Sequence, residues 1–351
     1  MQAQEILTDL VKSRVNDIFC IAGSPISYRQ DNQIMSLDGD GLSPDRTYEF
    51  ISQIYQLANE RSMERLLAVG DDDFSFAVKG VSRFRANVYK QRGSLAAVIR
   101  IVPFELPRAA ELNIPERIVK LAELRHGLVL FSGTAGSGKS TTLATIIDRI
   151  NNTRNAHIVT LENPIEFLHK HRQSLVSQRE VQIDTEDYAS ALRAAMRQAP
   201  DVILIGELRD PESISIALTA AETGHLVFST LHTLGAVNAV DRLLNSFDPN
   251  QQVQVRMQLS MVLVSVVSQQ LVQKIDGGVL PVFEIMHCTI AVRNLIREGR
   301  THQLAQVIDT SADAGMVGMD ASLLKLYQDG LIDSDEMLTH ALVPDNLTRF
   351  L

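Results

Sequence analysis

The chain of 351 residues is long enough for two domains, and its 45% hydrophobic and 21% charged residues exclude a disordered protein. Its formal net charge of −9 argues against nucleic acid as the main partner, because phosphate binding normally needs a basic surface. Two cysteines, Cys20 and Cys288, are too few for a disulfide framework or a structural zinc site. The first residues carry no basic-then-apolar leader, so we expect a protein of the reducing cytosol.

The first hundred residues predict a small α+β domain. Apolar residues at helical spacing predict helices over 3–15 and 43–59, the second beginning at Ser43 and Pro44. Short alternating runs predict strands at 17–22, 26–29, 34–37, 74–78, 84–89 and 95–102. We therefore place an N-terminal domain over residues 1–102, followed by a proline-punctuated linker over 103–115 that starts at Pro103.

Arginines mark one face of this domain. Strand alternation places Arg83 and Arg85 on the face opposite Phe84. Arg100 interrupts an otherwise apolar strand, and a charge at that position needs a partner. The arginines could form a solvated face, which is the commoner outcome for a charge stripe. Alternatively, they could supply guanidinium groups to a phosphate that is bound elsewhere.

Beyond residue 115, helices alternate with short buried strands, which predicts a mostly parallel sheet covered on both faces in a domain over 116–351. The expected strands are 128–131, 158–161, 202–205 and 226–229, and the expected helices are 116–126, 140–151, 188–197 and 211–222. Residues 257–272 are too polar to cross a bilayer and are expected to form a core helix. Helices are expected to dominate from there to the C-terminus.

A glycine-rich loop follows the first of these strands and leads directly into a helix. It reads Gly133, Thr134, Ala135, Gly136, Ser137, Gly138, Lys139 and Ser140, followed by Thr141. Glycines allow successive backbone N–H groups to face a polyphosphate, Lys139 would reach the β- and γ-phosphates, and the Ser140 hydroxyl would ligate magnesium. The alternative is a glycine-rich turn without a ligand. Strand, loop, lysine, hydroxyl and helix together favour a site for a nucleoside triphosphate and Mg²⁺.

Two acids follow neighbouring buried strands of the same domain. Glu162 follows strand 158–161 and Glu207 follows strand 202–205, with Glu166 close behind the first. Catalytic groups of α/β sheets lie at the carboxyl ends of strands, so the pair favours catalysis over two acids that merely face solvent. His232 follows strand 226–229 and could contact the γ-phosphate. A histidine there could equally be a structural residue, and spacing alone does not decide.

Four segments of the phosphate-loop domain together form a specific combination. They are the Walker A loop 133–140, an acidic box at 160–167, a Walker B segment at 201–210 and a histidine box at 223–233. In this combination the chain resembles the secretion ATPases of type II and type IV systems, and within them the type IV pilus retraction (PilT-type) ATPases. The resemblance implies an α/β, RecA-like P-loop ATPase core with a smaller α+β, PAS-like N-terminal domain.

The resemblance also implies roles for individual residues. Glu207 would act at the magnesium ion and the attacking water, and Glu162 would assist. His225 and His232 would belong to the histidine box. Arginines matching Arg85, Arg92 and Arg100 reach the phosphates in such motors. The family further implies a homohexamer with ATP between the two domains, located in the cytoplasm and held at the inner membrane by the pilus machinery and its platform protein.

Two features favour the retraction branch. Residues 291–297 read Ala-Val-Arg-Asn-Leu-Ile-Arg, one conservative change from the retraction signature. The four-cysteine insert and the longer N-terminal region of the extension and type II motors are also expected to be missing. A related motor for protein or DNA secretion is the alternative within the family. A slow nucleotide-gated scaffold is another, supported by Asn163 where the acidic box normally has Asp, and a helicase-like protein fits the acidic balance least.

Overall fold

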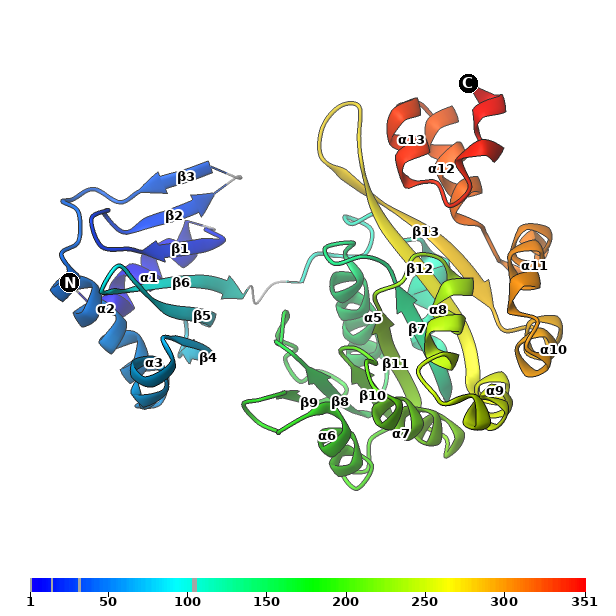
Figure 1. The fold of residues 1–351 in the computed structure, drawn as a ribbon, viewed down its shortest axis with the longest axis horizontal. Helices are drawn as coiled ribbons and strands as arrows, with labels where there is room; N and C mark the ends of the chain where they lie inside the picture. Colours follow the sequence, from blue (N-terminus) through cyan, green and yellow to red (C-terminus); the bar gives the residue numbers. More distant parts are fainter. Residues whose placement is uncertain (1, 14, 31–32, 103–105) are drawn as a thin grey trace. The chain divides into compact units, whose positions relative to one another are not determined.

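The computed structural model describes residues 2–13, 15–30, 33–102 and 106–351. The chain divides into two compact units, one of residues 1–105 with 166–168 and one of residues 106–165 with 169–351 (Figure 1). Of the predicted linker, residues 103–105, Pro103 included, lie outside the described residues, and residues 106–115 group with the second unit. Each unit is described by itself.

The first unit is built on a six-stranded antiparallel sheet with the order β3-β2-β1-β6-β5-β4. The strands are β1 (Asp17–Cys20), β2 (Ser27–Gln30), β3 (Gln33–Ser36), β4 (Asp71–Val78), β5 (Ser82–Gln91) and β6 (Ser94–Val102). Helices α1 (Ala3–Lys12) and α2 (Pro44–Leu57) bury Leu7, Phe50 and Ile54 in one core with strand residues such as Phe84. The six predicted strands and both helices are confirmed. Helix α3 (Glu64–Val69) was missed, because six residues are too few to display a helical period.

The start of α2 shows why the sequence folds this way locally. The Ser43 hydroxyl accepts a hydrogen bond from the Arg46 backbone N–H at 3.3 Å, and Pro44 occupies the first turn, where a missing N–H costs nothing. The predicted alternation in β5 is also present, with Arg83 and Arg85 half-buried and Phe84 and Ala86 fully buried on the other face.

The second unit is an α/β unit around a seven-stranded sheet with the order β13-β12-β7-β11-β10-β8-β9. Its strands are β7 (Gly127–Ser132), β8 (His157–Glu162), β9 (Leu175–Glu180), β10 (Val202–Ile205), β11 (Leu226–Leu231), β12 (Leu263–Gln273) and β13 (Val279–His287). All neighbouring pairs are parallel except β12 and β13. This confirms the predicted mostly parallel sheet.

Helices cover both faces of this sheet, as Figure 1 shows. One core contains Leu143 and Ile147 of α5 (Lys139–Thr153) together with Ile118 of α4 (Glu116–Val119). The opposite core is formed by α6 (Tyr188–Ala195), α7 (Pro211–Glu222), α8 (Ala236–Leu244), α9 (Pro249–Val262), α10 (Ile290–Glu298) and α11 (Leu304–Thr310). Beyond them lie α12 (Met319–Gln328) and α13 (Ser334–His340), which pack on the ends of β12 and β13.

The prediction of a core helix over 257–272 was wrong. Helix α9 ends at Val262, and the chain continues as β12, which pairs with β7 on one side and β13 on the other. An apolar run without glycine or proline breaks does not distinguish a buried helix from a buried strand, and here pairing on both sides decides for the strand. Strands β9 and β13 were also missed. The predicted helix 116–126 is shorter, because α4 passes into a 3₁₀ turn at Lys120–Glu123.

Among the described residues, no helix is both long enough and apolar enough to cross a membrane. The feature of the fold that positions the site is the shared carboxyl edge of β7, β8, β10 and β11. In register, Ile205 at the end of β10 lies beside Leu161 of β8 and Ser229 of β11. The segments that follow these strands therefore leave the sheet at the same edge.

Candidate nucleotide-binding site

The predicted phosphate loop connects β7 to α5 and lies against β12. A Cβ atom at Gly133, whose φ is +145°, would be 2.3 Å from the Gln269 backbone oxygen. One at Gly138, with φ +86°, would be 2.8 Å from Gln269 Nε2. The Thr142 hydroxyl donates to Gln269 Oε1 at 2.9 Å. Gln269 is thus the buried support behind the loop, and the sequence did not reveal it because it lies in the segment predicted as a helix.

The outer side of the loop is open. A Cβ atom at Gly136 would meet nothing within 4 Å, and Thr134, Ala135 and Gly136 are exposed. Helix α5 begins after Gly138 without a side-chain cap, so its first backbone N–H groups remain available to an anion. Lys139 is only 6% exposed, and its ammonium donates to the Gly133 and Thr134 backbone oxygens at 2.8 Å. These features form a cradle that fits a polyphosphate.

The acid after β10 and the histidine after β11 meet at the same edge. Glu207 is 8% exposed, and its Oε2 lies 3.1 Å from His232 Nε2. Its other oxygen, Oε1, lies 2.6 Å from a guanidinium nitrogen of Arg209, which holds the pKa of that guanidinium above its usual range. Sequence reasoning did not single out Arg209, whose position two residues after the acid gave no separate indication of a role.

Glu162 ends β8, the strand next to β10. Its Oε1 accepts a hydrogen bond from the Thr160 hydroxyl at 2.6 Å and another from the Gln178 amide of β9 at 3.3 Å. The structure therefore places both predicted acids at one edge of the sheet, on adjacent strands. Glu166 lies in the short segment 166–168 that groups with the first unit.

His225, the other predicted histidine, does not lie in this cluster. It precedes β11, and its Nδ1 lies 2.9 Å from the Ala220 backbone oxygen at the end of α7. His232 follows the same strand. The six residues of β11 lie between the two histidines, which makes seven steps along the strand, so at roughly 3.3 Å per residue the histidines are about 23 Å apart. The physical reason is that the histidine box spans a whole strand, so its two ends reach opposite edges of the sheet.

The three predicted arginines belong to the first unit. Arg100 donates to Asp17 Oδ1 at 2.8 Å, so Asp17 is the partner that the sequence required. Arg85 Nε lies 3.9 Å from Asp73 Oδ1. Arg85 and Arg100 line one pocket of about 300 Å³, together with Asp17 and Asp73. Arg92 lies in the turn between β5 and β6, with φ +48°.

A pocket beside the phosphate loop was not predicted. It has a volume of about 200 Å³. Its walls are mostly apolar and come from three segments: Leu112, Asn113 and Ile114, then Thr141 and Thr142 of α5, and Leu271, Val279 and Pro281 of β12 and β13. An apolar pocket next to a polyphosphate cradle suits a flat base. Sequence reasoning missed it because it treated residues 103–115 as a linker.

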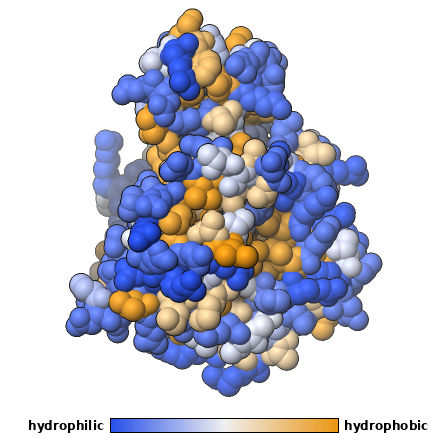
Figure 2. Space-filling model, turned by 90° about the vertical axis from the view of Figure 1, so that its right-hand side faces the viewer, coloured by the Kyte–Doolittle hydropathy of each residue, from blue (hydrophilic) through white to orange (hydrophobic). Residues whose placement is uncertain are grey.

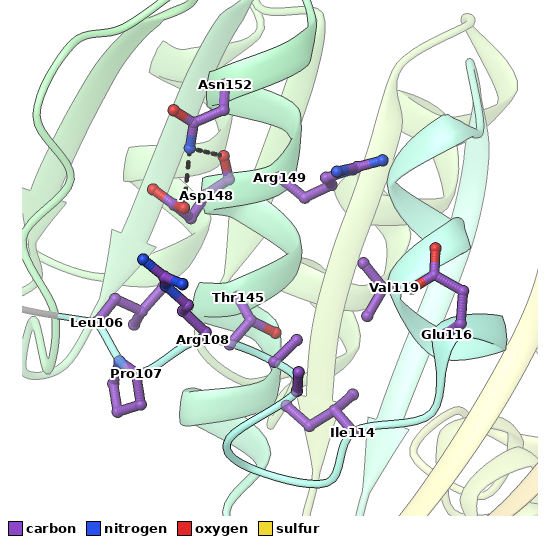
Figure 3. A pocket seen from close by; sticks show the side chains of 12 residues that line it. Leu106, Pro107, Arg108, Ile114, Glu116, Val119, Thr145, Asp148, Arg149 and Asn152 are labelled. Carbon is purple, nitrogen blue, oxygen red and sulfur yellow. Dashed lines mark hydrogen bonds between the residues drawn. The ribbon is translucent and has the colours of Figure 1, made fainter.

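A second pocket, of about 450 Å³, lies along α5 and shares Ile114 with the first. Figure 3 shows α5 between the segment that carries Arg108 and the turn that carries Glu116 and Val119. Asn152 donates to Asp148 Oδ2 at 2.8 Å, and burial raises the pKa of Asp148. Residues 106–116 therefore separate two hollows on the surface of α5.

Comparison with known proteins places the chain in a family. Residues 2–313 match the model of the Type II/IV secretion system protein family, and the chain belongs to that family. It is 41% identical over 346 residues to the type IV pilus retraction ATPase PilT of Pseudomonas aeruginosa, covering 99% of this chain and 100% of that one.

Two solved structures are similar over nearly the whole chain. The crystal structure of the pilus retraction motor PilT with bound ADP has a TM-score of 0.92 at 42% identity, covering 99% of each chain. The ATPase DotB of Legionella pneumophila has a TM-score of 0.77 at 28% identity, covering 95% of this chain and 94% of that one.

Replacing Gly133 by Ala should destabilise the second unit more than replacing Gly136. The new methyl group at position 133 would overlap a backbone oxygen of β12 in addition to straining φ, so we expect a loss of about 3 kcal/mol in the free energy of unfolding. Gly136→Ala, with strain but open space, should lose about 1 kcal/mol. Urea unfolding of both variants measures the difference, and equal losses would contradict the close approach of the loop to Gln269.

Proposed function

We propose that this protein is an ATP-hydrolysing motor that powers retraction of type IV pili by disassembling them. Similarity to the retraction ATPase of Pseudomonas aeruginosa over the full length of both chains carries the proposal. A site with a phosphate cradle and a buried acid beside a histidine supports it, because hydrolysis needs groups that bind the phosphates and orient water. The family model is that of the Type II/IV secretion system protein, so a related secretion motor is the alternative.

ATP would bind with its phosphates over the first turn of α5 and its base in the pocket lined by Leu112 and Leu271. The ADP bound in the similar PilT structure supports nucleotide binding by this protein. Lys139 would release its backbone oxygens and turn to the phosphates. Ser140 and Glu207 offer the oxygen ligands that Mg²⁺ prefers and would hold that ion, which when bound neutralises phosphate charge.

For hydrolysis, Glu207 would orient the attacking water and accept its proton, and Glu162 would assist from the adjacent strand. His232 would keep Glu207 in place through its 3.1 Å contact and would face the γ-phosphate. Arg209 neutralises the charge of Glu207 through their 2.6 Å ion pair. Each role uses a group that already lies at the carboxyl edge of the sheet.

We further propose a homohexamer of RecA-like cores (residues 116–351) with PAS-like N-terminal domains (residues 1–102) and nucleotide between domains. The common pocket of Arg85 and Arg100 supports a phosphate-directed role, which Arg92 would share. Hydrolysis would then change the angle between domains. The motor would act in the cytoplasm, at the inner membrane, through the pilus platform protein.

The proposed cargo-side element is α10, which contains the signature 291–297. Val292 and Ile296 are buried, whereas Arg293 and Arg297 are exposed. The neighbouring α9 exposes Val253, Met257 and Met261 at helical spacing. Figure 2 views the side of the molecule that carries α10 and α11, where apolar residues gather between hydrophilic ones. This mixture suits contact with another protein of the pilus machinery.

Replacing Lys139 by Ala should abolish ATP hydrolysis, because the phosphates lose their buried cation. We expect a fall in kcat/KM of about 10²-fold or more. A steady-state phosphate-release assay measures it, with Lys325→Ala, an exposed lysine of α12, as the matched control. Normal turnover by Lys139→Ala would refute the assignment of the phosphate loop.

Replacing Arg293 and Asn294 together by Ala should leave ATP hydrolysis intact and stop pilus retraction. Their hydrogen bonds are local, from Arg293 to the Cys288 backbone oxygen at 3.2 Å and from Arg297 to Asn294 at 2.6 Å, so the fold should persist. Retraction is scored in cells that carry the variant as their sole copy, beside Arg300→Ala. If hydrolysis disappears as well, α10 belongs to the catalytic scaffold instead.

A further inference from the structure

A buried carboxylate on β13 holds the starts of two helices that lie far apart in the chain. Glu284 is 5% exposed. Its Oε1 accepts a hydrogen bond from the Ala236 backbone N–H of α8 at 2.5 Å, and its Oε2 accepts one from the Met319 backbone N–H of α12 at 3.3 Å. A glycine precedes each helix, so neither has a side-chain cap of its own. One side chain therefore supplies the acceptor for the first N–H group of both helices.

Helix α8 directly follows the histidine turn (residues 232–235), which carries His232 away from β11. At the beginning of this turn, His232 Nε2 contacts Glu207 Oε2 at 3.1 Å. At its end, the Gly235 backbone N–H donates to the Ser268 hydroxyl of β12 at 3.0 Å, one residue before the bond from α8 to the carboxylate on β13. The histidine turn is therefore held at one end by the acid of the site and at the other end by β12 and β13.

The C-terminal segment (residues 319–343) reaches the same turn. The Asp320 carboxylate of α12 accepts hydrogen bonds from the Leu342 and Val343 backbone N–H groups at 2.7 and 3.0 Å. The Leu342 side chain lies close to Gly235, where an added Cβ atom would be 3.3 Å from its Cδ1. The C-terminal segment thus adjoins the histidine turn directly and is also joined to it through the carboxylate on β13. It begins beyond the residues that match the family model.

The two oxygens of a carboxylate explain why an acid occupies this buried position. Burial raises the pKa of Glu284 and so disfavours its charged form, whereas the two backbone N–H groups lower that pKa. A glutamine of the same length offers only one accepting oxygen, because its amide nitrogen donates. The acid can therefore serve both helix starts at once, which its amide cannot do.

We propose that Glu284 is a positioning residue for hydrolysis, which joins the histidine turn to the start of α12 and thereby fixes His232 beside Glu207. The inference rests on the proposed ATPase function. The His232 side chain is 54% exposed, so packing alone does not fix its ring and the backbone of the turn must do so. A displacement of α12 would reach His232 through this one buried side chain. The C-terminal segment would in this way be coupled to hydrolysis.

Glu284→Gln tests this role, because it keeps the shape of the side chain but leaves one accepting oxygen for two N–H groups and removes the charge. We expect kcat for ATP hydrolysis to fall about three- to tenfold, with KM for ATP nearly unchanged because the phosphate loop is not altered. In a His232→Ala background the same substitution should cause no further loss, since the residue that it positions is gone. An unchanged kcat, or equal losses in both backgrounds, would overturn the inference and leave the proposed ATPase function standing.

The matched control is Glu336→Gln in α13. The Glu336 carboxylate also accepts a backbone N–H of β12, from Gln273 at 2.5 Å, but at the end of that strand and beyond Ser268. This variant should be less stable, yet its kcat and KM should equal those of the wild type. A kcat as low as that of Glu284→Gln would show that any loosening of the C-terminal helices has this effect, and the specific role of Glu284 would be refuted. A wild type without ATP hydrolysis would instead refute the proposed function.

Amide hydrogen exchange judges the link independently of activity. In Glu284→Gln, exchange should be about three- to tenfold faster in the peptides that contain the histidine turn and the start of α12, because their N–H groups lose a charged acceptor. In Glu336→Gln the same peptides should exchange as in the wild type. Unchanged exchange at both helix starts in Glu284→Gln would show that the carboxylate does not hold them, and the inference would fail.

Discussion

The parallel pairing of β7, β11, β10 and β8 is the constraint on which the site depends. Parallel strands in register deliver the segments after them to one edge, so a loop, two acids and a histidine that are scattered over a hundred residues become neighbours. The backbone hydrogen bonds of the sheet thus bring the site residues together, which local sequence preferences alone could not do. Helices on both faces stabilise that register by burying both sides of these strands.

The phosphate loop depends on a second contact, with β12. Gln269 accepts a hydrogen bond from the Thr142 hydroxyl and comes close to Gly133 and Gly138, so the loop rests on a residue that lies 127 positions beyond Thr142 in the chain. Gly133 and Gly138 must be glycine because β12 is so near, whereas the outer side of the loop remains open to phosphates. On the acid side, Glu207 already has both oxygens occupied, by Arg209 and His232, which keeps a buried carboxylate paired before any ligand arrives.

Much of this arrangement could be predicted from the sequence. The phosphate loop, Glu162, Glu207 and His232 follow recognisable buried strands, and the parallel sheet follows from the alternation of strands and helices. What failed depended on partners distant in the chain. Strand β12 was predicted as a helix because a segment that is buried on both faces shows no alternation typical of a strand, and Gln269 was missed with it. The pocket at Leu112 could not be found without packing, because its walls come from separate segments of the chain. His225 and His232 belong to one motif, although a full strand separates them.

The measurement that tests the central claim most directly is the steady-state ATPase rate of the purified protein, wild type beside Glu207→Gln, together with its size in solution. The proposed function predicts a magnesium-dependent rate in a hexamer that is lost in Glu207→Gln, because the amide keeps the shape of the acid but cannot accept the proton of the attacking water. A wild type that binds ATP but scarcely hydrolyses it, or a Glu207→Gln variant that hydrolyses ATP at the wild-type rate, would contradict it.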